Sequence, residues 1–178
     1  MSLRKMPSSH AKPKKKPCIF TGFLLVVLML ASAAAIALLM HGRLFKDQVP
    51  DVGFDTVSQA VLDASDLSSE KQGDNQTIKR YYGLDPASFD QYLIYYPNGV
   101  MDVDELLLVR VTDPEAAKEV VDAAHSRIDT QKANFNGYGT NQTELLNKSV
   151  IEQRGNYVLL VVADNADQVK AAFEKTLS

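Results

Sequence analysis

Three acidic residues just before a predicted strand are the first candidates for chemistry in this sequence. Asp102, Asp104 and Glu105 place carboxylates close together, and such groups can bind a hard cation through oxygen or act in acid–base catalysis. Acids before a strand are also common solvating residues, and no calcium-loop glycine spacing follows them. We interpret them as surface acids, with an envelope hydrolase or a cation-binding protein as the alternative.

His125 is the only histidine within the predicted folded domain. A zinc centre needs three or four ligands, and a histidine-assisted nucleophile needs a serine or cysteine that no spacing here identifies. We interpret His125 as a residue at the boundary of an apolar helix face. The sequence therefore predicts no catalytic residue, no cofactor and no metal site.

Tyrosine is concentrated in one stretch, which holds five of the seven tyrosines within 16 residues. Its members are Tyr81, Tyr82, Tyr92, Tyr95 and Tyr96. A tyrosine ring offers a rigid apolar face with a polar tip, which suits contacts with protein or with glycan, although the absence of tryptophan weakens the glycan version. Core and edge packing of a strand is the plainer interpretation, and an interaction surface is the functional hypothesis.

The element that would place these residues in the cell is the apolar segment 18–40, which has no charged side chain. A helix of this length is ~34 Å long, enough to cross a hydrocarbon core of roughly 30 Å. Residues 1–17 carry six basic side chains and no acid, and basic flanks favour the cytoplasm. We predict a single transmembrane helix with a cytoplasmic N-terminus and an extracellular C-terminal domain.

A cleaved signal peptide is the alternative, because Ala31, Ser32 and Ala33 offer small residues at which a signal peptidase could cut. The apolar run continues beyond them through residues 36–40, whereas a signal peptide has an apolar core of about 7–15 residues. We therefore predict an uncleaved signal-anchor, a juxtamembrane stalk over residues 41–53 and an extracytoplasmic domain over residues 54–178.

The charge of the two parts differs in sign. The whole chain has a net charge of -3, but its first 40 residues hold six of the 19 basic residues, so the remainder has 13 basic against 22 acidic residues, or -9. Such a domain repels phosphate, which excludes nucleic acid as a partner. The single cysteine, Cys18, leaves the outer domain without an internal disulfide, so its stability must come from an apolar core.

In the outer domain, a succession of two strands and one helix occurs twice. Strands over 91–96 and 105–111 precede a helix with an apolar stripe, and strands over 150–154 and 157–163 precede a second. The stripes consist of Ala117, Val120, Val121, Ala124 and Ile128, and of Ala166, Val169, Phe173 and Leu177. We predict an α+β domain with a four-stranded antiparallel sheet that carries its helices mainly on one face. The repeated order has two possible explanations, an internal duplication of the chain or a spacing that any two such modules would share.

Three further features of the domain follow from local patterns. Strand 157–163 is apolar on both faces and should lie centrally in the sheet. A helix over about 55–64 is predicted to be capped by Asp55, and a second short helix from about Asn75 to end at Gly83 in a left-handed conformation.

Four motifs together resemble a bacterial family known as domain of unknown function 4358. They are Tyr81-Tyr82-Gly83-Leu84-Asp85, Asp104-Glu105-Leu106, the helix over 127–135 with Tyr138, and Gly155-Asn156-Tyr157-Val158. The resemblance extends from about Phe54 to the C-terminus. It implies a membrane-anchored or lipid-anchored envelope protein of Gram-positive bacteria and supplies no catalytic or binding residue.

The function expected from these features is that of a non-catalytic interaction module at the cell envelope. Its expected partners are the membrane, through one span, and another envelope protein or a wall component. A sensor is a further alternative, but the tail of 17 residues is too short to fold and would act only through a partner membrane protein. The oligomeric state is not predicted.

Overall fold

The computed structural model describes Met29, Ser32 and residues 51–67 and 70–178. The chain forms two units, residues 1–46 and 47–178, and the second contains the sheet. The predicted tail, all but two residues of the predicted span and residues 41–50 of the predicted stalk lie outside the described residues. In the part of the chain that is described, no helix is both long enough and apolar enough to cross a bilayer.

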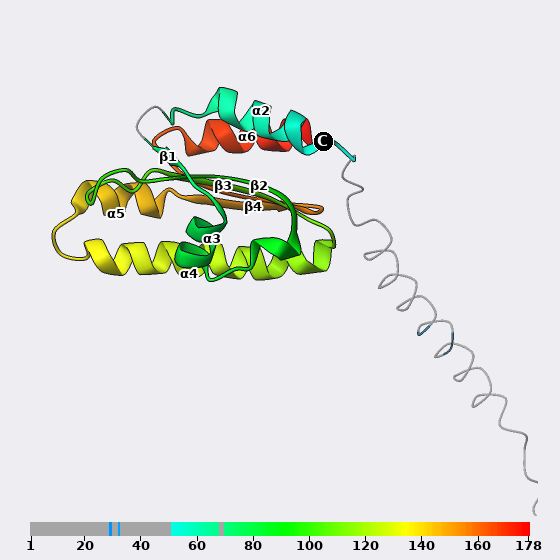
Figure 1. Ribbon diagram of the computed structural model, residues 1–178, viewed down its shortest axis with the longest axis horizontal. Helices are drawn as coiled ribbons and strands as arrows, with labels where there is room; N and C mark the ends of the chain where they lie inside the picture. Colours follow the sequence, from blue (N-terminus) through cyan, green and yellow to red (C-terminus); the bar gives the residue numbers. More distant parts are fainter. Residues whose placement is uncertain (1–28, 30–31, 33–50, 68–69) are drawn as a thin grey trace, which may run out of the picture. The chain divides into compact units, whose positions relative to one another are not determined.

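Unit 47–178 consists of an antiparallel sheet between two layers of helices (Figure 1). The strand order is β1-β2-β3-β5-β4, with β1 Lys71–Gln72, β2 Phe89–Tyr96, β3 Glu105–Val111, β4 Val150–Arg154 and β5 Tyr157–Val162. The helices are α2 Phe54–Ala64, α3 Asn75–Tyr82, α4 Ala117–Phe135, α5 Thr140–Asn147 and α6 Ala166–Thr176. Short 3₁₀ turns, Pro86–Ser88 and Pro114–Ala116, precede β2 and α4.

The α+β class and the antiparallel sheet are confirmed, but the prediction of helices mainly on one face is wrong. Helices α2 and α6 cover one face, where Leu106 and Leu159 are buried, and α3, α4 and α5 cover the other, where Leu107 and Leu160 are buried. The physical reason is that β3 and β5 are apolar at nearly every position. Both of their faces must leave water, so both need a layer of helices.

The sheet also has five strands in place of the predicted four. The additional strand, β1, contains only Lys71 and Gln72, both exposed, paired with Tyr96 and Tyr95. A polar dipeptide has no alternating apolar pattern, so periodicity could not reveal it. The other four strands were located correctly, and β5 lies in the interior of the sheet as expected.

The ends of two helices test the predicted caps. Helix α3 ends at Gly83, whose φ of 68° is the left-handed conformation that was expected, and Asp74 caps its start by accepting hydrogen bonds from the backbone N–H of Gln76 and Thr77. The cap predicted at Asp55 is wrong, because α2 already begins at Phe54. Asp55 lies in the first turn, where its negative charge interacts favourably with the positive end of the helix dipole.

The two strand-strand-helix units have opposite hands. Strands β3 and β5 are adjacent and antiparallel, so superposing one unit on the other requires a two-fold axis normal to the sheet, which would leave both helices on the same face. Helices α4 and α6 instead lie on opposite faces (Figure 1). The repeated order of elements therefore does not correspond to two copies of one rigid unit.

The buried stripe of α6 generates a stability prediction. Phe173 is fully buried against the sheet, so Phe173→Ala should lower the free energy of unfolding by about 3–5 kcal/mol through lost burial and the cavity left behind. Urea unfolding of residues 47–178 measures the change, with Val100→Ala, at an exposed apolar residue, as the control. A loss below about 1 kcal/mol for Phe173→Ala would contradict the assignment of this face.

Candidate functional site

A buried ion pair joins β3 to α4. Glu105 is the first residue of β3, and its side chain is 2% exposed, while that of Arg127 in α4 is 11% exposed. Arg127 Nη2 lies 2.7 Å from Glu105 Oε2, and Arg127 Nε donates to both carboxylate oxygens at 3.1 Å. Because a buried charge is costly without close partners, this bidentate geometry is what allows both groups to leave water.

Tyr82, in the last turn of α3, completes this network by donating its phenolic hydrogen to Glu105 Oε1. Burial, followed by the negative charge of Glu105 and the hydrogen bond to it, raises the pKa of the Tyr82 phenol well above its ordinary value. The phenol therefore stays protonated and remains a donor at physiological pH. Three elements, α3, β3 and α4, are thus tied together by one buried network.

The same arginine positions an aromatic cluster at the edge of this network. The guanidinium carbon of Arg127 lies 4.5 Å from the ring centre of Tyr81, and that of Arg80 lies 5.6 Å from the same ring. The ring of Tyr96 packs against Tyr81 with 5.7 Å between centroids. Cation–π contacts of this kind hold the tyrosine ring in place. We refer to Tyr81, Tyr96, Arg80 and Arg127 as the tyrosine wall.

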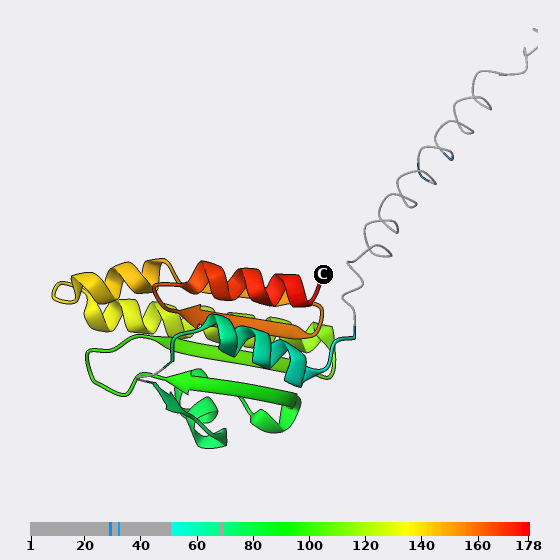
Figure 2. The same cartoon turned by 90° about the horizontal axis from the view of Figure 1, so that it is seen from above.

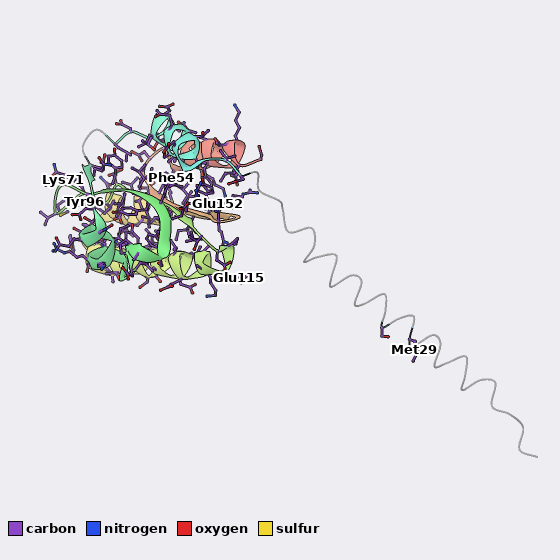
Figure 3. The ribbon with its side chains drawn as sticks, turned by 45° about the vertical axis from the view of Figure 1, so that its right-hand side comes forward. Met29, Phe54, Lys71, Tyr96, Glu115 and Glu152 are labelled. Carbon is purple, nitrogen blue, oxygen red and sulfur yellow. The ribbon has the colours of Figure 1, made fainter. Side chains whose placement is uncertain are left out.

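Two hollows flank the tyrosine wall, and Tyr81 lines both. The larger is an open groove of about 890 Å³ between α3 and the ends of β1 and β2. It is lined by Gln72, Gly73, Asp74, Gln76, Thr77, Lys79, Arg80, Tyr81 and Tyr96. The smaller, of about 220 Å³, lies against α4 and the β2–β3 loop, and Arg127, Phe135 and Tyr138 line it with Pro97 and Val100 among others. In Figure 3, Tyr96 and its strand neighbour Lys71 mark the end of the sheet next to the groove.

The five tyrosines singled out in the sequence do not form one surface. Tyr82 is buried in the ion-pair network. Tyr92 bonds Asn75 and packs edge-on against Phe89, and Tyr95 packs on the opposite face of the sheet with α2 and α6. Of the five, only Tyr81 and Tyr96 line these hollows, Tyr81 both of them and Tyr96 the larger. The packing interpretation therefore holds for Tyr82, Tyr92 and Tyr95, and the interaction surface stays a hypothesis for the other two.

The acidic residues and the histidine have different surroundings in the structure. Asp102 accepts a hydrogen bond of 2.8 Å from the backbone N–H of Gly99 and so stabilises the β2–β3 loop. Glu105, interpreted as a surface acid, is instead a buried partner of Arg127, and His125 is exposed on α4. Over residues 51–67 and 70–178, no three His, Cys, Asp or Glu side chains are grouped so that they could hold a metal ion.

The carboxyl of Asp104 is half-buried and lies near other acidic side chains. Burial, then the negative charge of Glu70, and further those of Asp164 and Asp102, raise the pKa of the Asp104 carboxyl above its ordinary value. Glu70 and Asp164 therefore lie near enough to act on Asp104, although they are far from it in the sequence.

The pairing of Glu105 with Arg127 was not predicted from the sequence, although a signal for each was present. Glu105 shares its strand face with Leu107 and Val109, so the two-residue period of β3 already places it on a buried face. Arg127 lies three residues after Ala124 and four before Gln131, both buried in α4, and therefore borders the inner stripe. A charged residue on each of two packed inner faces indicates a buried pair.

The comparisons with known proteins identify a family and nothing closer. A family model described as domain of unknown function (DUF4358) matches residues 63–163, which include Tyr82, Glu105 and every member of the tyrosine wall. Neither a curated protein nor a solved structure matches the chain.

The buried ion pair generates a prediction by double substitution. Glu105→Gln or Arg127→Met alone should lower the free energy of unfolding by about 3–5 kcal/mol, because each leaves a buried charge without its partner. Glu105→Gln combined with Arg127→Met should cost less than the two single losses together, since no charge remains buried. Urea unfolding measures all variants, and additive losses would show that the two side chains are not coupled.

Asp104 generates a prediction about pH. Because the folded state holds its proton more tightly than the unfolded chain, stability falls as the pH rises from about 3.9, the ordinary aspartate value, through the raised pKa. Asp104→Asn should therefore raise the free energy of unfolding at pH 7, with a gain that disappears at low pH. Urea unfolding at several pH values measures this, with exposed Asp129→Asn in α4 as the control. A loss of stability at pH 7 would contradict it.

Proposed function

Since this chain belongs to the family described as domain of unknown function (DUF4358), whose description names no activity, we propose that it is a membrane-anchored, non-catalytic interaction module at the bacterial cell envelope. Its folded domain faces the outside of the cell and contacts another envelope protein or a wall component.

The observation that carries this proposal is the tyrosine wall between its two hollows. Tyrosine and arginine are the residue types that most often dominate binding energy at interfaces. Here the ring of Tyr81 is held by two guanidinium groups and by Tyr96, so a partner need not spend free energy on ordering it. The buried network beneath it joins Tyr82, Glu105 and Arg127 across three elements, which gives the ring a rigid support.

The location is supported by the sequence and by the family resemblance. An uncharged segment over 18–40 after six basic residues favours a cytoplasmic N-terminus and an outer domain. Members of the family resemble anchored envelope proteins of Gram-positive bacteria. The net charge of -9 after residue 40 disfavours phosphate-rich partners, which leaves proteins and uncharged or cationic wall components as the chemical classes that fit.

An envelope hydrolase or cation-binding protein built on the acidic cluster is the alternative. Mutual repulsion near Asp104 is a feature that a bound cation would relieve, but Glu105 is already committed to Arg127 and Asp102 to the β2–β3 loop. A sensor acting through a partner membrane protein is compatible with the same interaction surface and differs only in what the partner does.

A membrane-impermeant crosslinker added to intact native cells tests location and function together. The full chain should form a specific adduct with an envelope protein or a wall fragment. Tyr81→Ala and Arg80→Ala should each reduce the adduct several-fold, since removal of a central aromatic or arginine typically costs about 2 kcal/mol or more of binding. The crosslinked yield is measured against the unfolding midpoint of each variant.

The controls keep residue type and exposure matched. Tyr92→Ala changes a tyrosine that lines neither of these two hollows, Lys118→Ala changes an exposed cation of α4, and His125→Ala changes the isolated histidine. These three should leave the adduct unchanged. Failure of the crosslinker to reach the domain would refute the extracellular location, and equal adducts from all folded variants would refute the tyrosine wall as the contact.

A further inference from the structure

Large apolar side chains that are exposed in residues 51–67 and 70–178 gather at one end of the domain. They are Val100, 96% exposed, Met101, 49%, and Tyr138, 65%. Val100 and Met101 belong to the β2–β3 loop and Tyr138 follows α4, yet Val100 and Tyr138 line the same smaller hollow. Gln142 Nε2 in α5 donates to the Met101 carbonyl oxygen at 3.0 Å and joins the β2–β3 loop to this helix. We refer to these three residues as the apolar tip.

The apolar tip lies at the far end of the sheet from the point where the chain enters the domain. The Val52 carbonyl accepts a 2.7 Å hydrogen bond from the Tyr157 hydroxyl, at the end of β3 where Tyr157 pairs with Arg110. The β2–β3 loop precedes the opposite end of β3, and Figure 2 shows this loop and the α4–α5 connection together, away from the start of α2. The apolar tip and the N-terminal entry of the chain thus lie at opposite ends of this domain.

Acidic side chains lie at the same end of the sheet as the apolar tip. Asp102 is exposed in the same loop, and Asp104 precedes β3 while Asp164 follows β5, at the same end of the sheet. The charges of Glu70, Asp164 and Asp102 all act on Asp104. Two cations on this side are already paired: Lys148 with Glu144 at 2.7 Å, and Arg127, which lines the smaller hollow, with Glu105 at 2.7 Å. The surface is therefore apolar at its centre and negative at its rim.

This combination selects one occupant among those that an apolar patch admits. Two copies of the chain meeting tip to tip would bring their acidic rims together, and an anionic lipid surface would be repelled in the same way. A neutral glycan would gain nothing from the rim. An apolar side chain flanked by lysine or arginine gains from both parts of the surface.

We propose that the apolar tip is a docking site for a segment of a partner protein that presents an apolar side chain between lysine or arginine residues. This inference rests on the proposed function and names the chemistry of the partner at the surface next to the tyrosine wall. Burial of Val100 and Tyr138 supplies affinity, and the rim carboxylates supply selectivity and a dependence on ionic strength.

The experiment places a photo-crosslinking amino acid at position 100 of the full chain in intact native cells. Peptide mapping of the adduct should locate it in a protein segment in which an apolar residue is flanked by lysine or arginine. A photo-crosslinker at Glu119, exposed near the start of α4, is the positional control and should not give this adduct.

We then measure the dissociation constant of a synthetic peptide of the mapped segment for the full chain in neutral-lipid nanodiscs. Val100→Ser and Asp102→Asn should each weaken binding by about tenfold, and the effect of Asp102→Asn should shrink at high salt. Asparagine keeps an oxygen that can accept from Gly99, so the loop is preserved. Asp129→Asn, an exposed acid of α4, is the matched control and should change nothing.

Several outcomes overturn the inference and leave the proposed function intact. The first is an adduct from position 100 on a second copy of this chain, on lipid or on an acidic segment. The second is unchanged peptide affinity in both tip variants. The third is no adduct from position 100 while Tyr81→Ala still reduces crosslinking to a partner by the general crosslinker. Loss of every adduct, from position 100 and from the general crosslinker alike, would instead refute the proposed function.

Discussion

The burial of β3 and β5 on both faces is the constraint on which the rest of the domain depends. Leu106 and Leu108 face one layer of helices and Leu107 and Val109 the other, so neither face of the sheet can be left to solvent. The connections of the chain meet this requirement by sending α4 to one face and α6, with α2 beside it, to the other. The opposite hands of the two strand-strand-helix units are a consequence of this demand.

The ion pair of Glu105 and Arg127 follows from the same geometry. A carboxylate on an inner face of β3 is not solvated by water and needs a charged partner. The facing helix, α4, is the element that supplies a cation at that depth. Replacement of such a pair by apolar groups is often neutral for stability, so its value here lies in geometry. It fixes the depth of α4 against β3 and, through Tyr82, that of α3, and it leaves the other side of the Arg127 guanidinium to hold Tyr81.

The sequence predicted elements well and their assembly less well. The spacing of Val169, Phe173 and Leu177 identifies a buried helix stripe, and all three are buried. Such a stripe does not indicate which face of the sheet the helix covers, because that depends on the direction in which the chain turns after the end of β5. The site was harder still. Tyr81 and Tyr96 were found by composition, but Arg127 is separated from them by more than thirty positions, and only packing brings the three together.

The tyrosine wall and the apolar tip differ in how they can bind, and the difference follows from what holds them. Tyr81 is fixed by cation–π contacts and by a buried network, so its surface is preorganised and binding there costs little ordering. Val100 and Met101 lie in a loop held by Asp102 and by one side-chain bond from Gln142. Such a loop can adapt to the shape of a segment, at the cost of ordering it. Because both surfaces border the hollow beside Arg127, a segment docked on the tip as proposed would lie next to a rigid aromatic ring.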